Sequence, residues 1–169
     1  MDTPCLKTKI DYQSYDVKNE QELLRQFLKE KSWSVGDDFL ALLKEGDIIE
    51  IYAFPSHTQV YANKEFLKLS SYTLEQMSTI PFQKLFWRES DIQHQLIKRA
   101  VAVVEGGSTQ AWGLPPHDLV ESLHPNRRTF EMHMGFIAPV YNTAGVAVGW
   151  ASTLRVEYVF EWPAASGAD

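Results

Sequence analysis

The chain has 169 residues, of which 44% are hydrophobic and 22% are charged, and its formal net charge is −6. This length suits one well-packed domain with a terminal extension and is short for two domains. The acidic balance argues against a nucleic-acid surface, because phosphate binding relies on clustered basic residues, and the densest basic spots are Lys98-Arg99 and Arg127-Arg128. No stretch approaches the ~18 apolar residues of a membrane span. A single cysteine, Cys5, excludes an intrachain disulfide and makes the cytosol the expected compartment.

The first 45 residues divide into two segments. Residues 1–16 are polar and mixed, which predicts a flexible lead. Residues 17–45 are expected to form a helical extension, because Leu23, Leu24, Phe27 and Leu28 recur at helical spacing between Val17 and Lys31. Asn19 is a possible cap of this helix, and Asp37 or Asp38 can cap a second helix that stops at Gly46.

Residues 61–77 carry the densest structural signal of the chain. Strands are predicted over residues 47–54 and 59–62, and Asn63 can then cap a short helix that turns Phe66, Leu67 and Leu69 inward. Thr73 and Gln76 have the spacing of a capping box, so a further helix is expected to begin there.

The second half of the chain predicts a long helix and a hairpin. Residues 81–86 suit a short helical turn, Ser90 or Asp91 can cap a longer helix that Gly106-Gly107 ends, and residues 119–123 are expected to form a third strand. Apolar residues then alternate along two strands joined by a turn at residues 142–145. The alternation places each of these sets on one face: Phe130, Met132, Met134, Phe136, Ala138 and Val140, and Val146, Val148, Trp150, Leu154 and Val156.

From about Leu42 to Val156, this order of elements resembles a PAS sensor domain. PAS domains place an Asn at the end of the second strand, a Phe and a Leu on the short helix, and then Gly-Tyr. Ser71 replaces that glycine, so it must either adopt a left-handed conformation at a cost of roughly 1 kcal/mol or form a different turn. Asn142 replaces the Asp that PAS domains carry in the last turn.

The resemblance implies an α+β PAS fold over residues 46–158, followed by a tail at 159–169. The expected architecture is a five-stranded antiparallel sheet with short helices and one long helix on one face. The implied function is sensing or protein interaction. Because only about a dozen residues follow the last strand, the chain is expected to be a free-standing regulator that binds a small molecule, a partner protein or both.

The space between the helices and the sheet is the expected ligand site. Methionine and aromatic side chains make an adaptable wall for an apolar or aromatic ligand. The candidates are Phe86, Trp87, Ile97, Trp112, Met132, Met134, Phe136 and Trp150. The same stripes are equally consistent with a filled core, and this set contains no charged residue to orient a ligand.

The sequence leaves the cofactor unknown. Haem-binding PAS proteins carry the iron ligand on the long helix, and this position falls on or near Leu96. His94 is a weak haem candidate, because a two-residue offset rotates a side chain by about 200°. The five histidines lack the short spacing of a helical metal pair, so no metal site is predicted. Flavin has no supporting residue, and a thiol photoadduct is excluded because the predicted domain contains no cysteine.

No enzymatic function is expected, because the chain lacks a Gly-x-Ser-x-Gly elbow and its Gly106-Gly107-Ser108-Thr109 segment lacks the lysine of a phosphate loop. One alternative is a small cone-shaped α+β enzyme with His94 or His133 beside Glu131 as acid and base. Alternation, however, places Glu131 and His133 on the face opposite the methionines. Another alternative is a ligand-free adaptor with a full cavity.

The N-terminal helix also has two possible roles. It can cover the outer face of the sheet, where Tyr52 and Ile137 would need cover, or it can pair with a second molecule. The resemblance favours a homodimer through this helix and an unidentified signalling partner.

Overall fold

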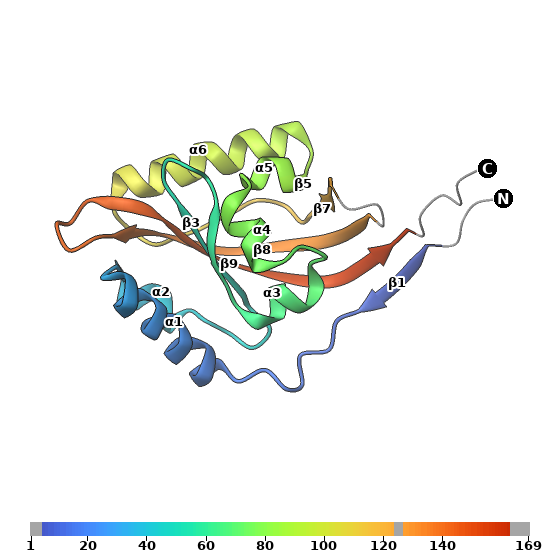
Figure 1. Cartoon of the computed structure of the whole chain (residues 1–169), viewed down its shortest axis with the longest axis horizontal. Helices are drawn as coiled ribbons and strands as arrows, with labels where there is room; N and C mark the ends of the chain where they lie inside the picture. The colour runs from blue at the N-terminus through green and yellow to red at the C-terminus, as the bar shows by residue number, and fades with distance from the viewer. Residues whose placement is uncertain (1–4, 124–126, 163–169) are drawn as a thin grey trace.

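A long antiparallel hairpin forms the centre of the fold (Figure 1). In the computed structural model, which describes residues 5–123 and 127–162, its strands are β8 (Arg128–Tyr141) and β9 (Ala147–Glu161). The turn between them is closed by Asn142, whose Oδ1 accepts hydrogen bonds from the amides of Ala144 and Val146. The predicted hairpin and the role of Asn142 are therefore confirmed.

The main sheet is antiparallel throughout, with the strand order β4-β3-β9-β8-β7. The other strands of this path are β3 (Ile48–Ala53), β4 (Gln59–Ala62) and β7 (His117–Glu121). Four short strands extend it, so the sheet has nine strands among the described residues and not five. They are β1 (Leu6–Lys9), β2 (Ser34–Val35), β5 (Phe86–Trp87) and β6 (Gln110–Ala111).

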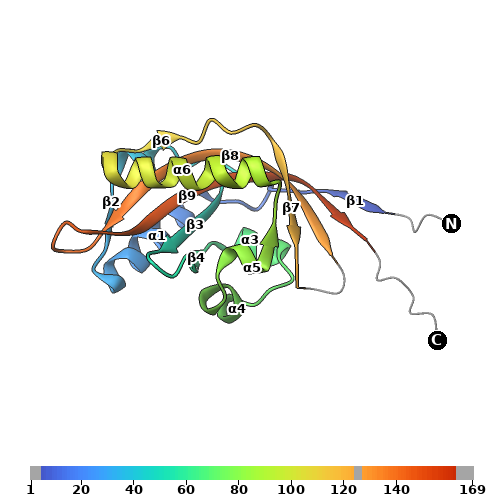
Figure 2. The ribbon, with the colours of Figure 1, turned by 90° about the horizontal axis from the view of Figure 1, so that it is seen from above.

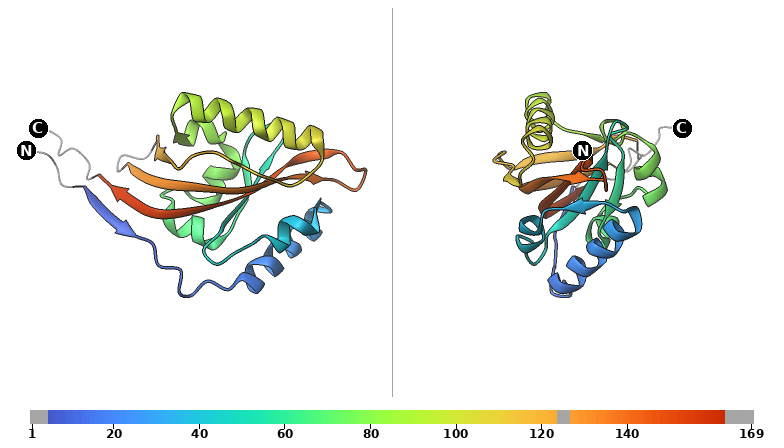
Figure 3. Two further views of the ribbon diagram at one scale, coloured as in Figure 1. Left: turned by 180° about the vertical axis from the view of Figure 1, so that it is seen from behind. Right: turned by 90° about the vertical axis from the view of Figure 1, so that its left-hand side faces the viewer.

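The helices cover both faces of this sheet. α6 (Ser90–Gly106) lies across one face, and α1 (Val17–Lys31) and α2 (Asp37–Ala41) lie against the opposite face (Figures 1 and 3). Three short helices follow β4, as Figure 2 shows from above. They are α3 (Lys64–Leu69), α4 (Leu74–Thr79) and α5 (Phe82–Leu85). No helix in the described ranges is long and apolar enough to span a bilayer.

Side-chain caps explain the starts of α1 and α4, whereas α2, α3, α5 and α6 begin without a side-chain cap. α1 has the predicted bounds, although its cap is Asp16 and not Asn19, since the Asp16 side chain accepts from the amide of Asn19. The Thr73–Gln76 capping box is present at the start of α4. α2 ends at Ala41 and not at the predicted Gly46.

Two predicted details of the Asn63–Ser71 region are wrong. Asn63 is the N-cap residue of α3, but its side chain does not cap the helix. Its Oδ1 accepts from the Ile49 amide at 3.2 Å and its Nδ2 donates to the Asp47 carbonyl at 3.0 Å, so it ties β4 to β3. Ser71 does not replace glycine in a left-handed turn. α3 ends in extended backbone at Ser70, and the Ser71 amide donates to Glu121 Oε1 at 2.7 Å. A different turn thus avoids the strain.

Two separate apolar clusters lie on the two faces of the sheet. The inner cluster faces α3 to α6 and includes Ile48, Tyr52, Phe130, Met132 and Leu154. The outer cluster lies under α1 and α2, and it contains Leu24, Leu28, Phe39, Leu40, Leu43, Ile49, Ile51, Ala138, Val140 and Ala151. The helical extension therefore docks in cis on the outer face.

A β-bulge in β8 corrects the predicted faces of the hairpin. Between the pairs Met134↔Leu154 and Ile137↔Ser152, two residues of β8, Gly135 and Phe136, oppose one residue of β9, Thr153. The extra residue shifts the alternation, so Ile137 faces inward and Phe136 packs on the outer cluster. Tyr52 and Ile137, expected to need cover on the outer face, are inner-cluster residues.

The return strand deviates in a similar way. A register shift opposite Val140 and Tyr141 leaves Val148 against the outer cluster, whereas Trp150, Leu154 and Val156 face inward as predicted. Val146 lies before the strand and is exposed.

Parts of the predicted flexible lead, residues 1–16, and of the predicted tail, residues 159–169, pair with each other as strands. β1 pairs with the end of β9, from Leu6↔Glu161 to Lys9↔Tyr158. β9 extends beyond β3, which leaves an open sheet edge that β1 pairs with. The lead is therefore a strand at residues 6–9, and the last strand continues through residues 159–161. Residues 1–4 and 163–169 lie outside the described ranges.

Candidate ligand pocket

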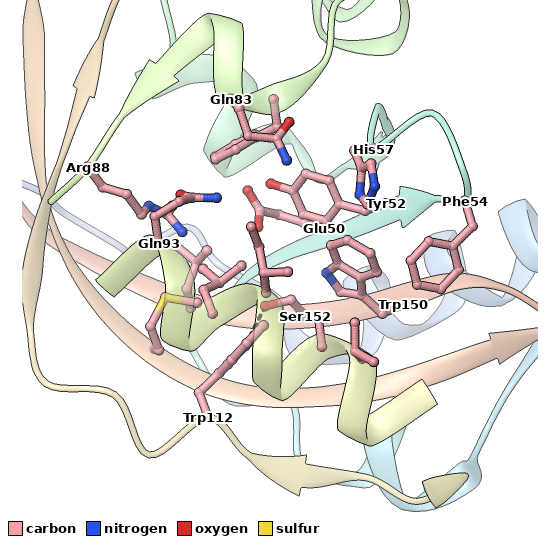
Figure 4. A pocket seen from close by; sticks show the side chains of 17 residues that line it. Glu50, Tyr52, Phe54, His57, Gln83, Arg88, Gln93, Trp112, Trp150 and Ser152 are labelled. Atoms are coloured by element: carbon pink, nitrogen blue, oxygen red, sulfur yellow. Dashed lines mark hydrogen bonds between the residues drawn. The ribbon is translucent and has the colours of Figure 1, made fainter. Parts of the chain in front are cut away.

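A pocket lies between α6 and the inner face of the sheet, with walls from β3, β8 and β9 (Figure 4). Its volume is about 50 Å³. A buried water needs about 10–15 Å³ of such volume. The pocket therefore has room for a few water molecules or for a small ligand.

Half of the predicted pocket residues line this space. They are Ile97, Trp112, Met134 and Trp150. The apolar wall is completed by Tyr52, Phe54, Phe82, Leu96, Ala100, Val101 and Leu154. A Tyr52–Trp150 stack, with ring centroids 5.3 Å apart, and a 2.8 Å hydrogen bond from Trp112 Nε1 to Ser152 Oγ fix the orientation of the large rings.

The other four candidates lie elsewhere. Phe86 and Met132 are buried in the inner cluster away from the pocket. Trp87 follows Phe86 in a short strand, so it points to the opposite side and is 60% exposed. Phe136 belongs to the outer face because of the bulge.

The polar part of the pocket was missed at the sequence level. It consists of Glu50, His57, Gln83, Arg88, Gln93 and Ser152. A signal for Glu50 was present, because it lies between Ile48 and Tyr52 on the inward-facing positions of β3. Arg88 lies in the link between β5 and α6, where no periodicity indicates the direction of a side chain. The predicted set, which contains no charged residue, therefore misses the charged groups of the pocket.

Glu50 is a buried acid, only 3% exposed. Burial raises the pKa of Glu50 from its ordinary 4.5 to about 7, although the nearby Arg88 charge and hydrogen bonds from Tyr52 and Gln59 lower it. The Gln59 Nε2 donates to Glu50 Oε1 at 3.0 Å. Near neutral pH this carboxyl group therefore exists in both protonation states.

Arg88 is a buried cation, 6% exposed. Its guanidinium lies over the Phe82 ring, 5.2 Å from the centroid, and its Nε has no hydrogen-bond partner. None of the ion pairs among the described residues includes Arg88. Burial lowers the pKa of Arg88, opposed by Tyr52 and Glu50. The guanidinium thus lines the pocket without a carboxylate in contact.

The haem candidate His94 is wrong for this pocket. His94 is exposed on α6 and does not line the cavity, whereas Leu96 occupies the wall. An aliphatic side chain cannot bind iron, so the described pocket offers no haem ligand from α6.

The acid-base residues of the alternative enzyme also lie outside the pocket. His133 Nε2 is 3.1 Å from Glu131 Oε1 and 3.6 Å from Glu157 Oε2, and all three residues are partly exposed. Their ligand atoms lie within 4.8 Å of one another, close enough to bind a metal ion. They follow the alternation opposite Phe130 and Met132 and therefore face away from the pocket.

Comparisons with known proteins give distant structural matches only. No family model and no curated protein matches the chain. Similar solved structures include a PAS domain from Colwellia psychrerythraea, with 17% identity over 79% of this chain and 96% of that chain and a TM-score of 0.48. A light-oxygen-voltage domain studied with a flavin analogue has 16% identity, coverages of 80% and 84%, and a TM-score of 0.46. A sensory box sensor histidine kinase from Vibrio cholerae has 16% identity, coverages of 82% and 96%, and a TM-score of 0.42.

The predicted arrangement, an antiparallel sheet with short helices and one long helix on one face, is the one observed. The chain has a PAS-like fold. At these identities and TM-scores the similarity carries no information about a ligand. The function is therefore inferred from the residues of the pocket.

Proposed function

We propose that this protein is a sensory module that binds a small molecule in the pocket beneath α6 and transmits its occupancy to another protein molecule. The single observation that supports the proposal is the burial of Arg88 and Glu50 around a cavity, without a direct ion pair between them. Burying an unpaired charge costs several kcal/mol. In a filled core, apolar side chains of similar volume would be more stable than these buried charges. A polar ligand, in contrast, would compensate the charges.

α6 is the element that would respond to occupancy. Only Ile92, Ala100 and Val103 of this helix are buried. Ile97 and Val101 line the pocket but are 40% and 45% exposed. A ligand that contacts these side chains would hold α6 closer to the sheet, and the exposed surface of α6 would then change.

The direct test is native mass spectrometry of the protein purified from its own host, read beside a denatured spectrum and a visible absorption scan. We expect a mass difference that disappears on denaturation. Ala100→Leu should fill the cavity and remove this difference, because Ala100 is buried and lines the pocket. Ala102→Leu is the control, since Ala102 is exposed on the same helix.

The opposite outcome would favour a ligand-free adaptor. Wild-type protein without a mass difference, together with a more stable Ala100→Leu variant, would mean that the cavity is a packing defect and not a binding site.

Glu50 supports a second candidate, an enzyme that uses this pocket. A carboxyl group with a pKa of about 7 beside a buried arginine is suited to general acid-base catalysis. We propose that the protein is not an enzyme and that the ligand is recovered unchanged after incubation. Turnover of the recovered ligand that Glu50→Gln abolishes without loss of binding would establish the enzyme.

Homodimerisation through α1 and a cytosolic location remain predictions. The centre of the apolar stripe, Leu24 and Leu28, is buried in cis, so a dimer through α1 would use its flank, where Leu23 is 43% exposed. Analytical ultracentrifugation of Leu23→Glu tests the dimer interface: a wild-type dimer that becomes a monomer supports the interface, and a variant with the same molecular mass as the wild type excludes it.

The single cysteine is the basis for the expected cytosolic location.

A further inference from the structure

We infer that the ligand of this pocket is a small monocarboxylic acid with an apolar tail, held by Arg88. The inference rests on the proposed function, because it names the chemical class of the molecule that the pocket would bind. It follows from the charge, the polarity and the size of the cavity.

The charge of the site requires an anion. Arg88 is the one permanently charged cation among the residues that line the pocket in the described structure. Its Nε is buried without a partner, and the described residues place no carboxylate in ion-pair contact with it. A planar guanidinium forms two parallel hydrogen bonds with a carboxylate. A ligand carboxylate would therefore satisfy both the charge and the free donor.

A single negative charge fits better than two. One guanidinium neutralises one carboxylate, and Glu50 lines the same cavity. In a buried site a second ligand charge would have no cation beside it and would be repelled by Glu50 whenever that group is ionised. Phosphate monoesters and dicarboxylates are therefore disfavoured.

The rest of the pocket fits an apolar tail. Figure 4 shows Arg88 and Gln93 at one end of the site and Phe54 and Trp150 at the other. A molecule with its carboxylate at Arg88 would place its tail against the aromatic rings. The volume of about 50 Å³ limits this tail to a few carbon atoms unless α6 moves outward.

Isothermal titration calorimetry with butyrate and butyramide tests the inference, because the two probes have nearly the same shape and differ in charge. We expect butyrate to bind at least about tenfold more tightly than butyramide, as a charge-assisted pair is stronger than a neutral hydrogen bond. Arg88→Met should abolish this preference, and Arg88→Lys should keep part of it because the charge remains. Arg25→Met is the control, since Arg25 is exposed on α1.

Each other outcome overturns a specific claim. Equal binding of the two probes, sensitive to Ala100→Leu, would leave the proposed function standing and refute the carboxylate. Preference for butyl phosphate over butyrate would also refute it. An acid preference that persists in Arg88→Met would remove Arg88 from the site. Failure of every probe to bind at millimolar concentration, together with no mass difference for the host-purified protein, would refute both claims.

Discussion

The two faces of the sheet are built from the same strands and differ in kind. Along β3, Ile49 and Ile51 face an apolar layer that α1 and α2 cover, whereas Glu50 and Tyr52 face a cavity under α6. The residues of the outer cluster are apolar, although α1 also buries Glu20 completely, and the inner face buries an acid and an arginine beside a cavity. Close packing of apolar side chains makes the outer layer stabilising. In the inner layer, the buried charges and the cavity lower the stability of the fold.

This difference predicts opposite responses to mutation. Removing atoms from the outer face should be costly, because nothing can fill the space left behind. Removing charge from the inner face should be neutral or stabilising in the absence of a ligand.

The largest effect is expected in the outer cluster. Leu24→Ala should lower the free energy of unfolding by about 2–5 kcal/mol, since Leu24 is fully buried between α1 and the sheet. Leu23→Ala, one residue away and 43% exposed, should change it by less than about 0.5 kcal/mol. Urea unfolding followed by circular dichroism measures both, and similar losses would mean that α1 is not docked in cis.

Glu50 should make the stability depend on pH. The folded state raises the pKa of Glu50 from 4.5 to about 7, so between these values the folded protein binds more protons than the unfolded chain. The resulting stabilisation is present below pH 4.5 and is lost as the pH rises through about 7, with an upper limit of about 3 kcal/mol. The difference between wild type and Glu50→Gln, measured by urea unfolding at several pH values, isolates this group. A pH-independent difference would contradict the prediction.

The bulge in β8 should tolerate no side chain at Gly135. A Cβ there would lie 2.4 Å from Thr153 Oγ1 and 3.0 Å from the Thr153 carbonyl oxygen. Gly135→Ala should therefore cost about 1–3 kcal/mol. Gly106→Ala is the matched control, because its Cβ meets nothing within 4 Å and it lies in α6, where alanine is favoured by up to about 1 kcal/mol. Equal thermal midpoints for the two variants would argue against the bulge.

The smallest expected effect has the opposite sign. Arg88→Met should raise the unfolding free energy of the ligand-free protein by about 1 kcal/mol, because it replaces an unpaired buried cation with an apolar side chain of similar length. Differential scanning fluorimetry would detect this as a small rise in Tm. A clear loss of stability would mean that Arg88 is a structural residue and not a site held ready for a ligand.

The features that the sequence predicts well are local ones. The bounds of α1 follow from an amphipathic period within one segment, and the Thr73–Gln76 capping box needs only residues three apart. The fold class follows from the order of such segments. The actual role of Asn63 required contacts with residues 14 and 16 positions away, which no local pattern contains.

The pocket was only half predictable for a related reason. Ile97, Trp112, Met134 and Trp150 were found because large apolar residues at regular spacing indicate an inner face. Arg88 was missed because it is in an irregular link, and Phe136 was misplaced because a bulge cannot be read from alternation. The period of apolar residues predicts neither the charged groups of this site nor the irregular backbone that positions them.

The bulge at Gly135 also makes a deletion milder than a substitution. Gly135 is the extra residue of the pair that opposes Thr153. If it were removed, Phe136 alone would oppose Thr153, and Met134 and Ile137 would keep their inward direction because strand alternation then requires it. A chain shorter by one residue at this point would keep both faces of the sheet, because a single residue between Met134 and Ile137 restores strict alternation.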